Sequence, residues 1–310
     1  MSIKQKMQFL LDTARQYPRI PVAVVDAGEE HILKGMFEAM EAGLVDPVLI
    51  GQPQKIRAVA DKLNIDLDDR EILPARSDEE ASEIGVDLVV ENKCSALAKG
   101  WIHTDTLMHA VLKRLRTTRR VSHIFVAELP SYHKLLFVTD AAINIQPDLM
   151  TKVSIVQNAV DLAQLLGVEQ PRVAALSAVE VVKPAIPSTL DAAALSIMAK
   201  RGQIRNAILD GPLAFDNAIS KEAARTKKID SEVSGEVDIL LAPNLDAANI
   251  LAKDLEYLAG ATLAGIVVGL QVPVLLTSRS DPPEARLLSA ALAVIIHHSL
   301  TEDAAGVCRT

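Results

Sequence analysis

The sequence predicts an α/β protein of two doubly wound domains, with helices on both faces of parallel sheets. The first observation is compositional: hydrophobic residues make up 49% of the 310 residues and aromatic residues only 3%. A core of Ala, Val, Leu and Ile suits parallel strands that helices cover. The second observation is that apolar runs alternate with helix-like stretches along the whole chain, which indicates βαβ units with right-handed crossovers.

Ten short apolar runs have the length and β-branched content of strands, which suits two domains better than one. They fall at residues 20–26, 45–50, 86–90, 123–127, 135–139, 173–176, 207–209, 237–241, 264–268 and 272–276. Helical patterns separate several of them, at residues 29–42, 106–116, 148–166 and 247–259. Residues 140–148 leave a strand and enter a helix, so they are the best candidate hinge. We expect one domain at residues 1–141 plus 270–310 and a second at residues 142–269.

Charge and cysteine content exclude several classes of protein. A net charge of −8 and a pI near 5.4 argue against general nucleic-acid binding, so a polyanionic ligand needs a local basic pocket. The two cysteines, Cys94 and Cys308, are too few for a disulfide framework or a zinc site, which favours a reducing cytoplasm. Glycine and proline residues divide the apolar stretch 258–276 into short pieces, so we expect no membrane span.

The stretch from residue 272 to residue 288 carries the clearest chemical signal. Its apolar strand ends before Ser278 and Arg279, and the following Asp281, two prolines and Glu284 fit the start of a helix. Open α/β sheets bind ligands beyond the carboxyl ends of strands, where a guanidinium can grip phosphate through two hydrogen bonds. The alternative is that Ser280 and Asp281 only cap the helix while Arg279 lies in solvent.

Polar segments also follow other predicted strands, and each has an alternative role in capping a helix or stabilising a turn. The candidate side chains in them are Lys99, Thr104, Asn144, Asp210, Asp216 and Asn249. Capping alone does not explain why the pattern recurs at several strand ends, which is where a shared cleft would form. No histidine spacing suggests a metal site, and no dinucleotide, Walker or nucleophile-elbow motif occurs.

Five of these segments together resemble the phosphate acetyltransferase and phosphate butyryltransferase family. They are KGWIHTDTL at 99–107, TDAAINIQP at 139–147, DGPLAFDNAIS at 210–220, VDILLAPNLDAANILAKDLEYLAG at 237–260 and VPVLLTSRSD at 272–281. Their order and spacing agree over nearly the whole chain, and the chain most resembles the acyltransferase part of bifunctional enoyl-CoA hydratase/phosphate acetyltransferases. The resemblance implies two α/β domains with a cleft between them, as in isocitrate and isopropylmalate dehydrogenases, and a homodimer.

The same resemblance implies reversible acyl transfer between acyl-CoA and inorganic phosphate, with coenzyme A and phosphate as substrates and no metal or prosthetic group. It places Ser278 and Arg279 at the reacting phosphate and thioester, and we expect the six polar residues above to bind the substrate. Acetyltransferase members carry an aspartate seven residues after that serine, as the base for the CoA thiol, but this chain has Ala285 there. Our hypothesis is that Asp281 supplies the base, or that the thiol ionises with less help.

Two alternatives stay open at this point. Ala285 suggests a catalytically silent acyl-CoA-binding subunit. A metal-dependent decarboxylating dehydrogenase of the same fold would need clustered aspartates, which Asp210 and Asp216 do not form from sequence. The preferred acyl-chain length depends on pocket side chains that are not contiguous in the sequence, and one methylene group changes selectivity by only about 1 to 3 kcal/mol.

Overall fold

The computed structural model describes residues 5–67, 70–278 and 281–304. The chain forms two compact units. The terminal unit contains residues 2–119 and 264–310, and the central unit contains residues 120–263. These units divide at 119/120 and 263/264. In the central unit β6 (Leu135–Thr139) pairs with β9 (Ile239–Leu241).

The terminal unit has a sheet with the strand order β3-β2-β1-β4-β11-β10. Its strands are β1 (Ile20–Val25), β2 (Val45–Gly51), β3 (Ile72–Pro74), β4 (Ala96–Lys99), β10 (Thr262–Val268) and β11 (Val274–Leu275). Strands β1 to β4 and β11 run parallel, and β10 runs antiparallel to β11. The carboxyl ends of five strands consequently lie along one edge of this sheet.

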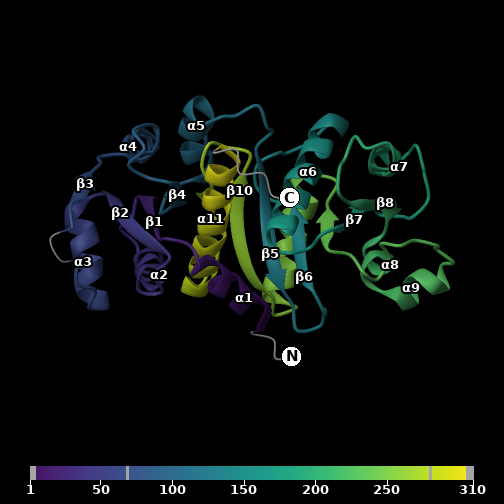
Figure 1. The fold of residues 1–310 in the computed structure, drawn as a ribbon, viewed down its shortest axis with the longest axis horizontal. Coiled ribbons are helices and arrows are strands. Elements are labelled where there is room, and N and C mark those ends of the chain that lie inside the picture. The colour runs from purple at the N-terminus through teal and green to yellow at the C-terminus, as the bar shows by residue number, and fades with distance from the viewer. Residues whose placement is uncertain (1–4, 68–69, 279–280, 305–310) are drawn as a thin grey trace. The chain divides into compact units, whose positions relative to one another are not determined.

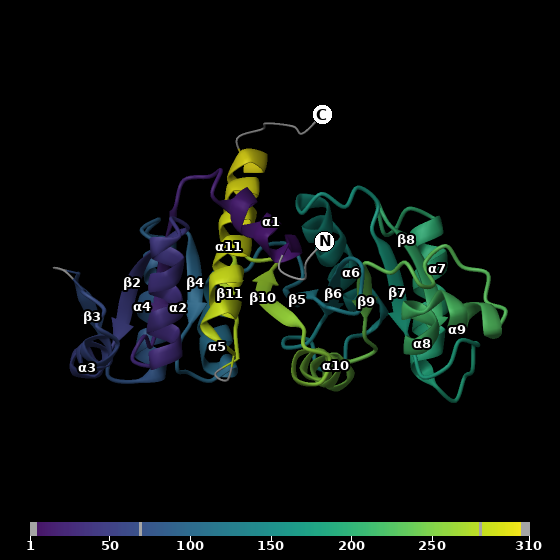
Figure 2. The same cartoon turned by 90° about the horizontal axis from the view of Figure 1, so that it is seen from below.

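Helices cover both faces of that sheet (Figures 1 and 2). They are α1 (Gln5–Ala14), α2 (Glu30–Glu41), α3 (Pro53–Leu63), α4 (Asp78–Val90), α5 (Thr104–Arg114) and α11 (Pro283–Ala304). Helices α4 and α5 pack together on one face, and α11 packs against α1 and α2 on the other. The chain winds from β1 through α2 and α3 to β3, and α4 then carries it back to β4 on the other side of β1. The winding direction therefore reverses between β1 and β4, and such a reversal is where open α/β sheets bind ligands.

The central unit has the strand order β5-β6-β9-β7-β8, in which β5 and β6 are antiparallel and the other pairs are parallel. Its remaining elements are β5 (Ser122–Glu128), β7 (Arg172–Leu176), β8 (Ile208–Leu213), α6 (Leu149–Leu165), α7 (Pro187–Lys200), α8 (Phe215–Ile219), α9 (Lys221–Thr226) and α10 (Leu245–Tyr257). Buried residues of α8 and α10 join side chains of the sheet in one apolar core. Helices α6 and α7 lie on the opposite face from α8 and α9 (Figure 1).

One predicted strand is wrong. Residues 86–90 are the last turn of α4, and the strand that precedes the polar segment is β4, at residues 96–99. Ser77 caps α4 by accepting a hydrogen bond from the Glu80 backbone N–H at 3.2 Å, and acidic residues fill the first turn. The buried residues of α4 also recur at helical spacing, so the cap and the packing outweigh the β-branched content of its end.

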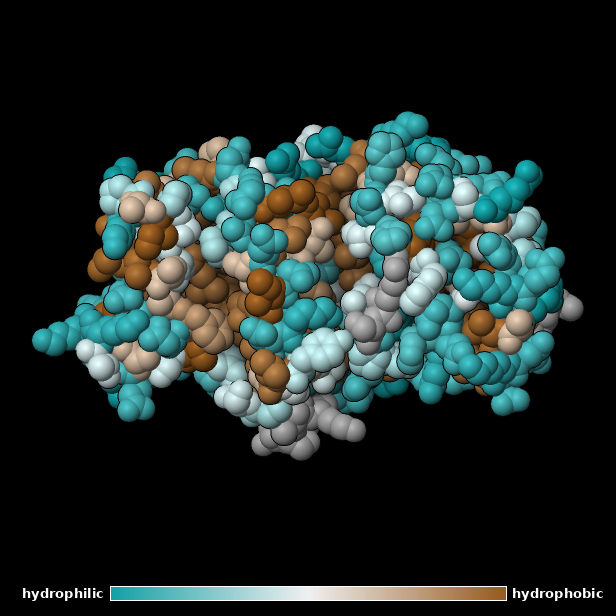
Figure 3. All heavy atoms as spheres, turned by 180° about the vertical axis from the view of Figure 1, so that it is seen from behind, coloured by the Kyte–Doolittle hydropathy of each residue, from teal (hydrophilic) through white to brown (hydrophobic). Residues whose placement is uncertain are grey.

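The surface carries apolar patches among polar side chains (Figure 3). The most exposed large apolar side chains belong to the central unit, where Leu258 is 84% and Ile145 70% exposed. Within the described ranges no helix has the length and apolarity that crossing a membrane requires, and the apolar stretch 258–276 contains β10 and β11 instead.

Candidate functional site

The predicted site residues lie in both units. The terminal unit carries Lys99, Thr104, Ser278 and Asp281, and the central unit carries Asn144, Asp210, Asp216 and Asn249. Arg279 lies outside the described residues.

Ser278 and Asp281 are linked in a tight turn between β11 and α11. The Ser278 backbone N–H donates to Asp281 Oδ2 at 2.7 Å, and the Asp281 backbone N–H donates to the Ser278 carbonyl at 3.2 Å. The Asp281 side chain is buried, with the residue only 3% exposed. A carboxylate in this position fixes the backbone of Ser278.

Arg286, in the first turn of α11, forms hydrogen bonds to the backbone of the same turn. One guanidinium nitrogen donates to the Asp281 carbonyl at 2.6 Å and another to the Ser278 carbonyl at 3.0 Å. Burial lowers the pKa of Arg286, while the nearby carboxylates of Asp281 and Glu29 oppose that shift. Gly35 of α2 leaves space for the Arg286 side chain, because a Cβ at residue 35 would lie 2.9 Å from Arg286 Cβ.

Sequence reasoning missed Arg286. The available signal was a single arginine inside the apolar run ARLLSAALAVII at 285–296, because a charge in a buried helix face needs partners that are themselves buried. Its partners turn out to be two backbone carbonyls of the turn that carries the predicted catalytic residues.

Lys99 ends β4 beside the same turn. It is buried, and with Thr277 and Arg286 it lines a small cavity. The two segments meet because β4 and β11 are parallel neighbours, with Ala98 opposite Leu275. Thr104 is the first residue of α5, which also follows β4.

Asn144 and Asn249 share a second turn, in the central unit. The Asn144 side-chain N–H group donates to Asp140 Oδ2 at 2.6 Å and to the Val121 carbonyl at 2.9 Å, and Asn249 donates to the Ala141 carbonyl at 3.1 Å. Asp140 also accepts hydrogen bonds from the backbone N–H groups of residues 142 to 144. Burial raises the pKa of Asp140, and the hydrogen bonds from Asn144 and the backbone oppose that shift.

Asp210 and Asp216 are not joined to that turn. Asp210 accepts a hydrogen bond from the Gly211 backbone N–H at 2.8 Å, and Asp216 pairs with Lys227 at 3.0 Å. The hydrogen bond from Lys227 lowers the pKa of Asp216. Among the described residues, no group of three His, Cys, Asp or Glu side chains could hold a metal ion, so the two aspartates are not part of such a cluster.

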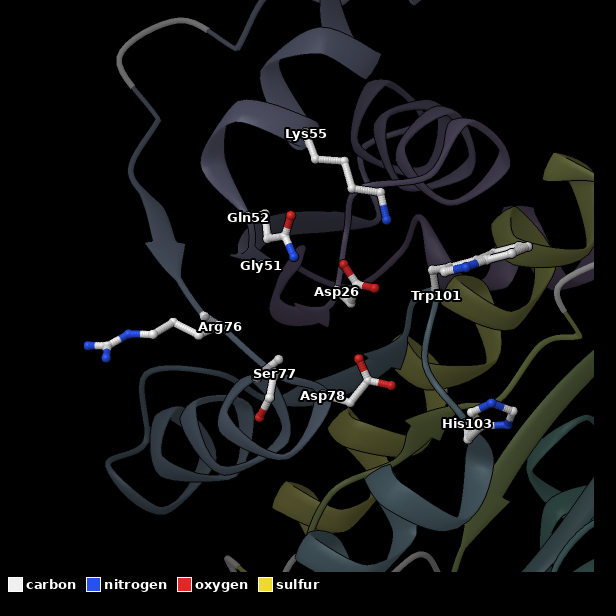
Figure 4. A pocket seen from close by; sticks show the side chains of 11 residues that line it. Asp26, Gly51, Gln52, Lys55, Arg76, Ser77, Asp78, Trp101 and His103 are labelled. Carbon is white, nitrogen blue, oxygen red and sulfur yellow. The ribbon is translucent and has the colours of Figure 1, made fainter.

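A polar pocket of about 300 Å³ opens at the edge of the terminal unit where the strands end (Figure 4). Its lining comes from the segments that follow β1, β2, β3 and β4. The lining residues are Asp26, Gly51, Gln52, Lys55, Ala75, Arg76, Ser77, Asp78, Ala81, Trp101 and His103. Sequence reasoning missed this pocket, because finding it requires the strand order that brings the ends of β1 and β4 together.

Asp26 lies at the centre of the pocket wall. Its φ of +56° is in the left-handed region, which costs energy for a residue other than glycine and often marks a functional position. Burial raises the pKa of Asp26, Lys55 opposes that shift, and Asp78 reinforces it. Figure 4 shows Lys55, Asp26 and Asp78 directed into the same space, with Trp101 beside it and Arg76 directed away.

Comparisons with known proteins agree on one family. The profile described as "Phosphate acetyl/butaryl transferase" matches residues 78–294. A phosphate acetyltransferase from Rickettsia typhi is 50% identical over 283 residues, covering 90% of this chain and 81% of the relative. A phosphate butyryltransferase from Clostridium beijerinckii is 41% identical over 290 residues, covering 93% and 96% respectively.

Solved structures give the same answer for the fold. A branched-chain phosphotransacylase from Enterococcus faecalis superposes with a TM-score of 0.76 at 31% identity, covering 90% of this chain and 99% of that one. A putative 4-hydroxythreonine-4-phosphate dehydrogenase from Salmonella typhimurium superposes with a TM-score of 0.53 at 12% identity, covering 90% and 99%. The predicted α/β fold of the dehydrogenase type is therefore confirmed.

Proposed function

The chain belongs to the phosphate acetyl/butyryl transferase family, and we propose that it moves a short acyl group reversibly between coenzyme A and inorganic phosphate. The observation that carries this proposal is the turn at Ser278, which Asp281 and Arg286 hold through four hydrogen bonds of 2.6 to 3.2 Å. Such a turn presents a hydroxyl at the carboxyl end of a strand, where a reacting phosphate can bind.

We propose that the CoA thiolate attacks the carbonyl carbon of an acyl phosphate. The sulfur–carbon bond forms, the bond from carbon to the phosphate oxygen breaks, and phosphate leaves with the electron pair. Arg279 is proposed to neutralise the departing phosphate, and the Ser278 hydroxyl to donate to the developing oxyanion. The Ser278 backbone N–H already donates to Asp281, which supports the hydroxyl as the donor.

The position of Asp281 supports a role in holding the turn over the role of base. Its carboxylate is buried and accepts the Ser278 N–H. A thiol is already a few per cent ionised near neutral pH, so the reaction can begin from the small thiolate fraction.

We therefore expect Asp281→Asn to lower kcat by about tenfold or more at every pH, because a misplaced catalytic turn loses rate whatever the proton concentration. The measurement is the pH profile of kcat from pH 6 to pH 9 for both proteins. A profile that loses one ionisation in the variant, with the rate restored at high pH, would instead make Asp281 the base.

We propose that the other predicted residues also contact the substrate. They are Lys99, Thr104, Asn144, Asp210, Asp216 and Asn249. The burial of Lys99 beside the Ser278 turn supports its assignment, and the shared turn of Asn144 and Asn249 supports theirs. Asp216 has the weakest support, because Lys227 already neutralises it.

We also propose that the enzyme is a cytoplasmic homodimer. Two cysteines are too few for a disulfide framework, and Cys94 is buried and forms no disulfide, which suits a reducing compartment. The exposed apolar side chains of the central unit suit a subunit interface, and light scattering of the purified chain tests the dimer.

The function is tested by incubating the purified chain with phosphate and acetyl-, propionyl- or butyryl-CoA. We expect free CoA to appear only when phosphate is present, together with an acyl phosphate that hydroxylamine traps as a hydroxamate. Acyl-CoA binding without either product would identify a silent binding subunit, and hydride transfer with a nicotinamide cofactor would identify a dehydrogenase.

A further inference from the structure

The Asn144 side chain in the central unit is fixed by hydrogen bonds that decide which of its groups can meet a ligand. Its Nδ2 amino group donates to Asp140 Oδ2 at 2.6 Å and to the Val121 carbonyl at 2.9 Å. A carboxylate and a carbonyl only accept, so the amino group must face them and both of its hydrogens are used. The amide oxygen Oδ1 is therefore the group that Asn144 can offer to a ligand.

Asp140 accepts hydrogen bonds on both of its carboxylate oxygens. Oδ1 accepts from the backbone N–H groups of Ala142 and Ile143, each at 3.1 Å, and Oδ2 accepts from the Asn144 backbone N–H at 3.2 Å as well as from its side chain. A proton on either oxygen would have to displace one of these donors. The geometry thus favours the ionised carboxylate, which orients the Asn144 amide in one way only.

Three parts of the central unit hold this turn. Val121 directly precedes β5, Asp140 directly follows β6, and Asn249 of α10 donates to the Ala141 carbonyl at 3.1 Å. Asp140 is only 3% exposed, whereas Asn144 is half-buried, so the carboxylate lies inside the fold and the amide is partly accessible. Among the described residues, none forms a hydrogen bond with Asn144 Oδ1.

We propose that Asn144 Oδ1 accepts a hydrogen bond from coenzyme A, and that Asp140 is the positioning residue that directs this oxygen away from the turn. The inference rests on the proposed function for the identity of the ligand, and on the hydrogen bonds above for the direction of the contact. Coenzyme A has N–H, O–H and S–H donors, whereas the carbonyl and phosphate oxygens of an acyl phosphate are acceptors near neutral pH. A fixed amide oxygen therefore favours the thiol substrate over the acyl phosphate.

Calorimetric titration of the full-length protein with coenzyme A measures this contact without turnover. Asn144→Ala removes the acceptor and should raise Kd for coenzyme A by about three- to tenfold, which corresponds to the loss of one hydrogen bond. KM for acetyl phosphate should stay within about twofold, because an acyl phosphate has no donor for the amide oxygen. Urea unfolding of the same samples verifies that the variant is folded.

A double-mutant cycle tests the role of Asp140. Asp140→Asn brings an amino group to a position that the N–H donors of the turn surround, so Asn144 should lose its orientation and Kd for coenzyme A should rise by about the same factor. If Asp140 acts through Asn144, the double variant Asp140→Asn/Asn144→Ala should bind coenzyme A as weakly as Asn144→Ala alone. Losses that add in the double variant would overturn the positioning role.

Asp238→Asn is the matched control, because Asp238 is also a buried aspartate that holds the backbone of this unit. It is 3% exposed, accepts the Arg172 backbone N–H at 2.8 Å and pairs with Lys134 at 2.9 Å. Asp238 directly precedes β9 and Asp140 follows its parallel neighbour β6, so the two aspartates lie at opposite ends of the sheet. Asp238→Asn should destabilise the protein but leave Kd for coenzyme A within about twofold.

Desulfo-CoA, which lacks the thiol, identifies the donor. If Asn144→Ala weakens binding of coenzyme A but not of desulfo-CoA, the donor is the S–H group, and equal losses for both ligands indicate an N–H or O–H group.

An unchanged Kd for coenzyme A in a folded Asn144→Ala protein that still transfers acyl groups would overturn the contact and leave the proposed function standing. Weaker binding of coenzyme A by Asn144→Ala, in a chain that transfers no acyl group before substitution, would support the contact and overturn the function. Asn144→Ser also lacks the amide oxygen, and it gives the same test if Asn144→Ala does not fold.

Discussion

Replacing Arg286 with methionine is expected to lower kcat by about 100-fold while the chain remains folded. Arg286 donates to the carbonyls of Ser278 and Asp281, and both bonds disappear in the variant. Displacing catalytic groups by about 1 Å can cost about 100-fold in rate. Methionine fills a similar buried volume without a charge, and such replacements of buried charges are often neutral for stability.

Steady-state kinetics and urea unfolding of the same samples separate the two effects. The control is Arg70→Met, which removes a partly buried ion pair with Asp46 that makes no contact with the residues around Ser278, and it should leave kcat unchanged. For Arg286→Ala, added guanidinium should restore part of kcat by filling the vacated space. An Arg286→Met protein with nearly full kcat, or a loss that only follows the unfolded fraction, would contradict the positioning role.

Replacing Gly100 with alanine is expected to destabilise the protein by about 3 to 5 kcal/mol, near the upper end of single substitutions. An added Cβ would lie 2.0 Å from the Asp26 carbonyl oxygen and 2.2 Å from that of Val25. Both obstacles are backbone atoms of β1 and its end, and the Gly100 N–H donates to the Val25 carbonyl at 2.8 Å. The two strand ends must therefore separate to admit a methyl group.

Gly28→Ala is the control for this prediction, and both proteins are compared by their urea unfolding midpoints. At Gly28 an added Cβ would meet only methylene groups of Lys55, the nearest at 3.0 Å, and a lysine side chain can shift. Gly28 is buried, but only a flexible side chain has to move, so we expect a much smaller loss than at Gly100, within about 1 kcal/mol. Equal midpoints for the two variants would contradict the prediction. They would show that the ends of β1 and β4 lie further apart at Gly100 than in the structure.

Much of the fold could be predicted from local pattern. The strands near residues 20, 45, 123, 135 and 173 were predictable because each is a short apolar run between polar residues. The run at 86–90 has the same composition but belongs to a helix, and the decisive signal was nine residues earlier, at the cap of Ser77. Composition of a short run does not separate a strand from the buried end of a helix.

The site could be predicted only where its residues are close together in the sequence. Ser278 and Asp281 are three residues apart, so their association was accessible from sequence. Lys99 joins them because β4 and β11 are neighbours, and the pocket forms because the winding reverses between β1 and β4. Strand order is a property of the whole sheet, so the short segments that carry these residues do not encode it by themselves.

The most direct test of the central claim is the phosphate dependence of an Arg279→Lys variant. If the guanidinium grips phosphate through two hydrogen bonds beside Ser278, lysine keeps the charge but loses the second bond. The variant should then raise KM for phosphate and lower kcat/KM by about tenfold or more, while KM for CoA stays within about twofold. Kinetics for phosphate that match the unchanged enzyme would contradict the account.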